Sequence, residues 1–161
     1  MTENILNLLK NLPAEVTVCI ISMLPIIELR GAIPVAIVTF HLSWLKAYII
    51  SVIGNLIPVI PILFLFKSIR KFLSVIPFLA KFFDWTEKRA YAKGEKIIRY
   101  GAIGLTLFVA IPLPMTGAWT GSLIALLFGI KPKFAIPAIT LGVLIAGIIV
   151  TLSVLGIKLL F

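Results

Sequence analysis

The sequence predicts an all-α integral membrane protein, built as an inverted repeat of a re-entrant helical hairpin followed by a transmembrane helix. Hydrophobic residues make up 61% of the chain and charged residues 13%, whereas soluble domains carry about 25% charged residues. Two long apolar stretches are each interrupted by polar residues and prolines. Each is followed by an uninterrupted apolar stretch long enough for a bilayer span, which takes about 20 residues.

Composition also excludes several classes of protein. The 161 residues form one membrane domain (1–161) without room for a soluble catalytic domain. The net charge of +9 lies in the gaps between apolar stretches, so it signals topology and not a nucleic-acid surface. Cys19 and His41 are the single cysteine and histidine, which excludes an intrachain disulfide and a cysteine-based metal motif. We expect the chain to have no enzymatic activity and to bind no cofactor.

The first half of the chain predicts three elements. Residues 1–13 alternate leucines with asparagines and lysine in the pattern of an interfacial amphipathic helix. Residues 16–40 predict the first hairpin, because one continuous helix would place two charges near mid-membrane and two prolines inside its hydrogen-bond ladder. We expect a non-helical tip at Glu28–Pro34, buried in protein or lining a wet cavity. Residues 47–66 predict the first span, kinked near Pro58.

The second half repeats this order after a basic segment. Residues 67–99 carry nine basic and three acidic residues, so we expect them on the cytoplasmic side. Residues 101–129 predict the second hairpin, with its tip at 112–121, and residues 134–155 predict the second span. Lys131 and Lys133 indicate that the second hairpin returns to the cytoplasmic side. Both termini then lie outside.

A weak internal repeat accompanies this order. Gly31-Ala32 matches Gly117-Ala118, and Gly54 matches Gly142 at an offset two residues larger. Such matches are common in a chain rich in alanine and glycine. The topology carries more weight: each half is a hairpin plus a span, and the halves run in opposite directions. Inverted repeats with discontinuous helices meeting near mid-membrane are a recurrent transporter design.

Glu28 and Arg30 are the strongest candidates for function. An apolar surrounding favours the neutral form of a carboxyl group unless a cation pairs with it, which suits Glu28 to carrying protons. Arg30 stays charged and is suited to binding a phosphate or carboxylate. Alternatively, the two side chains form an internal ion pair that only fixes the tip. Intramembrane ionisable residues are functional by default, which favours the first interpretation.

The second tip offers uncharged groups. Its hydroxyls, indole and exposed amides suit an anionic group, although Gly117 and Gly121 also fit a small-residue helix contact. Asn55 is a further polar candidate on the first span, and His41 is expected to be an interfacial residue. The predicted substrate cavity comprises Gly31, Pro34, Asn55, Pro112, Pro114, Thr116, Gly117, Trp119, Thr120 and Gly121.

The motifs ELRGAIP at 28–34 and PLPMTGAWTG at 112–121 resemble those of the prokaryotic small multi-drug export protein family. That family is similar to the wider DedA (VTT) superfamily, and the resemblance implies opposed re-entrant hairpins. Some DedA members are implicated in moving polyprenyl phosphate or phospholipids, with acidic and arginine residues at the hairpins. Glu28 corresponds in type to the acidic residue of the first hairpin. The second hairpin departs from the DedA pattern, because it lacks arginines.

We therefore expect a transporter or flippase in the prokaryotic plasma membrane, coupled to protons or another ion. Its substrate would be amphipathic or a lipid phosphate, bound between the two hairpins. One alternative is an exporter of cationic drugs that Glu28 binds, and a second is a membrane scaffold without transport. The expected partners are membrane lipids and a second copy of the chain in a homodimer, because two spans shield two hairpins poorly. No metal or nucleic acid is expected.

Overall fold

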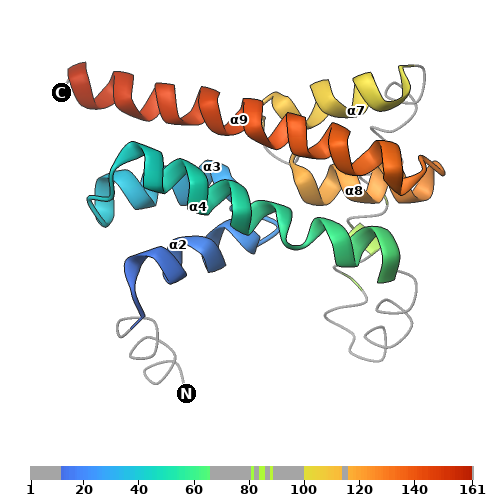
Figure 1. Ribbon diagram of the computed structural model, residues 1–161, viewed down its shortest axis with the longest axis horizontal. Helices are drawn as coiled ribbons and strands as arrows, with labels where there is room; N and C mark the ends of the chain where they lie inside the picture. The colour runs from blue at the N-terminus through green and yellow to red at the C-terminus, as the bar shows by residue number, and fades with distance from the viewer. Residues whose placement is uncertain are drawn as a thin grey trace. The chain divides into compact units, whose positions relative to one another are not determined.

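The computed structural model describes residues 12–65, 81, 84–85, 88, 100–113 and 116–160. The interfacial helix expected at 1–13 and the basic segment expected at 67–99 lie almost entirely outside these residues and stay predictions. Six labelled α-helices and one π-helix account for most of the regular structure of the described part, and residues 59–65 are also helical (Figure 1). The all-helical prediction is confirmed for those residues.

The chain divides into two compact units. The first comprises residues 1–55 and 147–161, and the second comprises residues 56–146. Two long helices contribute to both units: one runs over Trp44–Leu65 and the other, α9, over Pro132–Leu160. Along the chain, the earlier helix leads from the first unit into the second, and α9 leads back.

The first unit begins with the helix pair α2 (Ala14–Met23) and α3 (Glu28–Pro34). Helix α2 ends where Leu24 takes an extended conformation, with φ −73° and ψ 134°. Leu24 precedes Pro25, and the proline ring disfavours helical geometry in the residue before it. A turn over residues 24–27 leads into α3, whose Glu28 N–H donates to the Leu24 carbonyl at 3.0 Å.

The tip of this pair differs from the prediction. Glu28–Pro34 is helical, and the non-helical turn lies one turn earlier, at residues 24–27. A proline inside an α-helix clashes with the carbonyl four residues before it. Here Pro34 leads directly into a π-helix, η1 (Val35–Thr39), in which the Phe40 N–H donates to the Val35 carbonyl at 3.1 Å. The helix thus continues past Pro34 with π geometry in place of α geometry.

Helix α4 (Trp44–Leu56) follows the π-helix after His41, which has a left-handed φ of 53°. The helix resumes after a turn at residues 57–58, close to Pro58, and continues to Leu65. At Gly54, α4 approaches α2 closely: a Cβ there would lie 2.6 Å from the Cys19 carbonyl oxygen. The Ser22 hydroxyl on α2 also donates to the Ser51 carbonyl on α4.

The second unit contains the helix pair α7 (Gly101–Ala110) and α8 (Ala118–Leu127), followed by the first half of α9. Helix α7 ends at Ile111, which is extended, with φ −74° and ψ 118°, because Pro112 follows it. A Cβ at Gly142 on α9 would lie 2.8 Å from the Thr106 carbonyl oxygen on α7. Helix α9 therefore packs against the α7 backbone at this glycine.

Each unit has a close-packed apolar core. In the first unit, Val18, Leu29 and Ile33 are at most 1% exposed, and in the second unit so are Leu105 and Ile139. Alanines with no exposed surface complete both cores and let the helices approach closely: Ala32, Ala36, Ala47, Ala118, Ala125 and Ala135.

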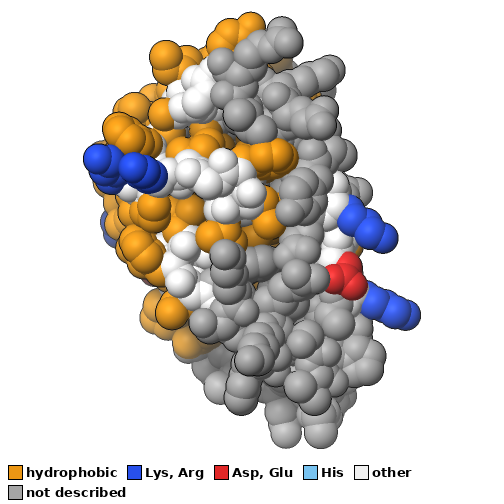
Figure 2. All heavy atoms as spheres, turned by 90° about the vertical axis from the view of Figure 1, so that its right-hand side faces the viewer, with side chains coloured by type: hydrophobic (Ala, Val, Ile, Leu, Met, Phe, Trp, Pro, Cys, Tyr) orange, Lys and Arg blue, Asp and Glu red, His pale blue; other side chains and the backbone are white. Residues whose placement is uncertain are grey.

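The two long helices have the character of membrane spans. Their most hydrophobic windows have mean hydropathies of 2.2 and 2.6, yet only 44% of each window is buried. A core helix of a soluble protein would be mostly buried, so the apolar outer faces of these helices are typical of a membrane protein. Figure 2 shows hydrophobic side chains gathered on the left of the view, with lysine or arginine side chains at their left edge.

Candidate functional site

Glu28 and Arg30 lie on α3 and are largely buried. Glu28 is 4% exposed, and its Oε2 lies 3.9 Å from Nη1 of Arg30, whose side chain is 18% exposed. Direct charge-assisted hydrogen bonds have lengths of about 2.7–2.9 Å. The two groups therefore attract one another without a tight hydrogen bond between these atoms. The structure brings together the two residues that the sequence singled out.

The backbone at Glu28 is unusual. Its φ is 50°, a left-handed value that residues other than glycine, asparagine and aspartate seldom adopt. It marks the junction between the turn at 24–27 and α3, where the chain reverses after Pro25. Residues held in such conformations concentrate at functional sites. The turn fixes Glu28 at the start of α3, two residues before Arg30.

The first unit also buries hydroxyl and amide groups on α2 and α4. Asn55 is 1% exposed, and Ser22 and Ser51 have no exposed surface. Within the described residues, the Asn55 Oδ1 and the Ser51 Oγ have no hydrogen-bond partner. A buried polar atom without a partner destabilises a fold by about 1–3 kcal/mol. Asn55 thus has an acceptor that the packing of the unit does not use.

Gly31 and Pro34 lie on the same helix as the charged pair. Pro34 lines a groove of about 510 Å³ in the first unit, together with His41 and Lys158. His41 is exposed, consistent with the interfacial position expected for it. The prediction that Gly31 and Pro34 line a substrate cavity stays a prediction.

The second tip lies in the second unit, where the Thr116 hydroxyl is directed at backbone carbonyls of the tip itself. The Thr116 hydroxyl lies 2.7 Å from the Ile111 carbonyl and 2.9 Å from the Leu113 carbonyl, and it closes the turn after Pro112. Gly117 precedes α8 in an extended conformation. Pro114 lies outside the described residues.

The remaining predicted residues of this tip lie on α8. Trp119 and Thr120 are half-buried, whereas Gly121 is buried. A Cβ at Gly121 would lie 2.6 Å from Cγ2 of Val109 on α7, so this glycine serves a helix–helix contact. That observation favours packing over ligand binding at Gly121.

Sequence reasoning missed four buried hydroxyls in the described part of the first unit, on Thr17, Ser22, Ser51 and Thr151. Their signal is weak, because a lone serine or threonine in an apolar helix commonly bonds the carbonyl four residues before it. The Ser122 hydroxyl does this, donating to the Ala118 carbonyl at 2.6 Å. Among the residues that the structure describes, no three His, Cys, Asp or Glu side chains are grouped as metal ligands.

These features define a helical membrane protein with two long apolar helices, two short helix pairs and a buried acidic–basic pair. A family model described as "Putative small multi-drug export protein" matches residues 28–149, well over half of the chain. The chain belongs to this family. The match begins at Glu28 and includes the second tip. No curated protein and no solved structure matches the chain.

Proposed function

We propose that the protein is a membrane transporter that moves an amphipathic, lipid-phosphate-like substrate, coupled to protons through Glu28, with Arg30 as the anion contact. The observation that carries this proposal is the buried pair on α3, with Oε2 and Nη1 3.9 Å apart inside an apolar helix pair. The family, whose description names export, supports membrane transport. The substrate class rests on the chemistry of the pair.

The energetics of the pair favour a functional role. Removing two charges from water costs several kcal/mol per ion, and only tight geometry with additional hydrogen bonds offsets that cost. Glu28 and Arg30, with Oε2 and Nη1 3.9 Å apart, are two such largely buried charges. A guanidinium in this setting gains from a phosphate, which accepts two parallel hydrogen bonds. Protonation of Glu28 would weaken its hold on Arg30 and leave the guanidinium to the anion.

We propose further that the two units are the inverted repeats expected from the sequence, each a re-entrant helix pair plus a span. Leu24-Pro25 and Ile111-Pro112 end first helices of 10 residues each. Four pairs of positions lie at the same offset in the sequence, and the two members of each pair share one feature. The features are, in order, a phenylalanine at the end of a helix, a residue with left-handed φ, the start of a long helix and a tightly packed glycine. The pairs are Phe40 and Phe128, His41 and Gly129, Trp44 and Pro132, and Gly54 and Gly142.

The two tips correspond in position but carry different polar groups, so we assign them different functions. At the second tip the Thr116 hydroxyl bonds a carbonyl of the same turn, whereas the first tip has the buried charged pair. The first unit also carries Asn55, whose Oδ1 finds no partner in the described residues. The charge chemistry of transport is therefore assigned to the first unit, with Asn55 as an additional polar contact for the substrate.

Translocation in liposomes tests this function. The purified chain is reconstituted with a fluorescent NBD-labelled phosphatidic acid, and dithionite reports the lipid in the outer leaflet, with and without an imposed proton gradient. We expect gradient-dependent translocation that Glu28→Gln and Arg30→Gln abolish. Lys46 and Glu15 are the matched control, because their ion pair has the same 3.9 Å distance but side chains 65% and 45% exposed. Glu15→Gln and Lys46→Gln should translocate at the wild-type rate.

The family description favours a second candidate, export of cationic drugs bound by Glu28. Ethidium accumulation in liposomes that contain DNA distinguishes the two. Transport of ethidium that requires Glu28 but not Arg30, without movement of the labelled lipid, would replace the lipid-phosphate proposal. Movement of neither compound in folded protein would favour the membrane scaffold. The homodimer also remains a proposal, which the mass of the particle in mild detergent tests.

A further inference from the structure

Thr151 on α9 carries a buried hydroxyl that the described residues leave without a hydrogen bond. Thr151 is only 5% exposed, and its Oγ1 has no hydrogen-bond partner among the described residues. Other hydroxyls of the chain bond the carbonyl four residues before them: Thr106 bonds Ala102 at 3.0 Å, and Ser153 bonds Ile149 at 2.8 Å. Thr151 departs from this local pattern, so its hydroxyl retains its hydrogen-bonding capacity.

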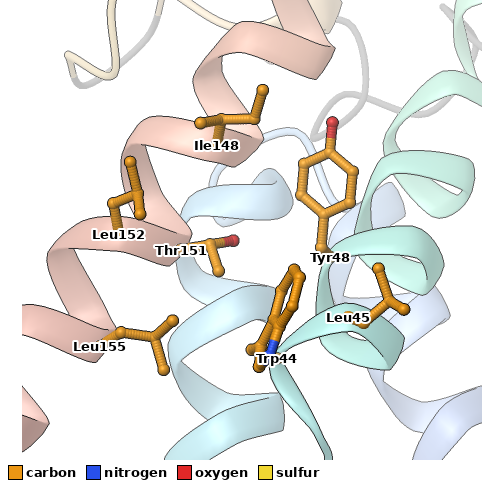
Figure 3. Close-up of a pocket in the computed structure, with 7 residues that line it drawn as sticks. All are labelled: Trp44, Leu45, Tyr48, Ile148, Thr151, Leu152 and Leu155. Carbon is orange, nitrogen blue, oxygen red and sulfur yellow. The ribbon is translucent and has the colours of Figure 1, made fainter.

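The hydroxyl borders a pocket between α4 and α9 within the first unit. The helices touch at Gly147, where a Cβ would lie 2.7 Å from the Tyr48 ring. One turn further on α9 is Thr151, and one turn earlier on α4 is Trp44. At that level a pocket of about 330 Å³ separates the helices. Figure 3 shows the Thr151 oxygen pointing from α9 toward α4, into the space beside Tyr48 and Trp44.

The walls of the pocket define the chemistry of an occupant. Two aromatic rings, of Trp44 and Tyr48, form the α4 side, and Ile148, Leu152 and Leu155 form the α9 side with Thr151. Aromatic rings favour flat partners in offset or edge-to-face contact. Ligand pockets are mostly apolar with a few placed polar groups, over about 300–1,000 Å³. A pocket at the small end of that range suits a molecule of two fused rings.

We propose that this pocket binds a small planar aromatic molecule with one hydrogen-bonding group, which Thr151 engages. A lipid acyl chain fits the apolar walls but leaves the buried hydroxyl unsatisfied, which is unfavourable. A hydroxyl or amine on an aromatic ring satisfies it. The site is separate from Glu28 and Arg30, and its test does not depend on transport.

Contact quenching of Trp44 fluorescence by brominated probes tests the site. The full chain is purified in detergent with Trp85→Phe and Trp119→Phe, which leaves Trp44 as the single tryptophan of the three. The probes are 6-bromo-2-naphthol and 2-bromonaphthalene, which share the ring system and differ by one hydroxyl. In this background, we expect the naphthol to bind about two- to tenfold tighter, the value of one net hydrogen bond.

Three variants assign that difference to Thr151. Thr151→Val keeps the shape of the side chain and removes the hydroxyl, so the two probes should bind equally. Thr151→Ser keeps the hydroxyl and should keep the preference, as should the matched control Ser153→Ala on the same helix. If Thr151→Val fails to fold, Thr151→Ala against Thr151→Ser makes the same comparison. The proposal is overturned if variants with and without the hydroxyl prefer the naphthol over the naphthalene equally. It is also overturned if brominated acyl chains quench Trp44 and neither aromatic probe does.

Discussion

Gly54 and Gly142 each face a backbone carbonyl of a neighbouring helix, α2 for Gly54 and α7 for Gly142. A Cβ at Gly54 would lie 2.6 Å from the Cys19 oxygen, and a Cβ at Gly142 would lie 2.8 Å from the Thr106 oxygen. Backbone atoms cannot move aside as a side chain can. The two glycines thus set how closely each long helix approaches its neighbour.

Substitution of either glycine should therefore destabilise the fold by a similar amount. We expect Gly54→Ala and Gly142→Ala each to lower the free energy of unfolding by about 1–3 kcal/mol, as overpacking does. The control is Gly156→Ala on α9, which meets no atom within 4 Å. It should be neutral or stabilising, by up to about 1 kcal/mol, through helix propensity. Thermal unfolding followed by circular dichroism measures all three. Unchanged melting of the first two variants would contradict the packing.

The hydrogen bond from Ser22 to the Ser51 carbonyl joins α2 to α4 and should stabilise the first unit. Ser22→Ala should reduce the free energy of unfolding by about 0.5–1.5 kcal/mol, the net value of one hydrogen bond. Ser153→Ala removes a hydroxyl that bonds its own helix at an exposed position, so the melting temperature should hardly change. Equal melting temperatures for the two variants would mean that the bond between the helices contributes nothing.

His41 and Gly129 share a left-handed backbone, with φ of 53° and 71°. A residue with a Cβ pays about 1 kcal/mol there, and glycine does not. His41→Gly should therefore raise the melting temperature, and Gly129→Ala should lower it. The pair of opposite shifts is measured by thermal unfolding of both variants. A fall in both would mean that the His41 side chain stabilises the fold more than its backbone strains it.

We predict that Asn55 lowers the stability of the fold and contributes to translocation. Its Oδ1 is buried without a partner in the described part of the chain, so Asn55→Leu should raise the free energy of unfolding. The same variant should slow translocation of the labelled lipid if Asn55 contacts the substrate. A more stable variant with wild-type translocation would remove Asn55 from the site.

Some of this architecture follows from the sequence because its cause is local. Pro25 and Pro112 each disfavour helical geometry in the residue before them, and the first helix of each pair ends there. Pro34, by contrast, lies inside a helix that continues past it as a π-helix, which the hydrophobic pattern of the sequence does not indicate. The sequence therefore placed the first tip one turn too late.

The candidate site shows the same division. Glu28, Arg30 and Asn55 are conspicuous as polar residues in apolar sequence, and the structure buries Glu28 and Asn55 and most of Arg30. Thr151 looks like any threonine on a long helix. Whether a hydroxyl bonds its own helix or points into a pocket depends on the neighbouring helix, which the sequence does not specify.

The double variant Glu28→Leu with Arg30→Met tests the role of the charged pair most directly, through its rate of lipid translocation at a known melting temperature. Removing one partner of a buried pair destabilises a protein by about 3–5 kcal/mol, whereas replacing both with hydrophobic residues of similar volume is often harmless. We predict that the double variant melts near the wild-type temperature and does not translocate the labelled lipid. Wild-type translocation by the folded double variant would contradict the account and leave the pair a structural feature of α3.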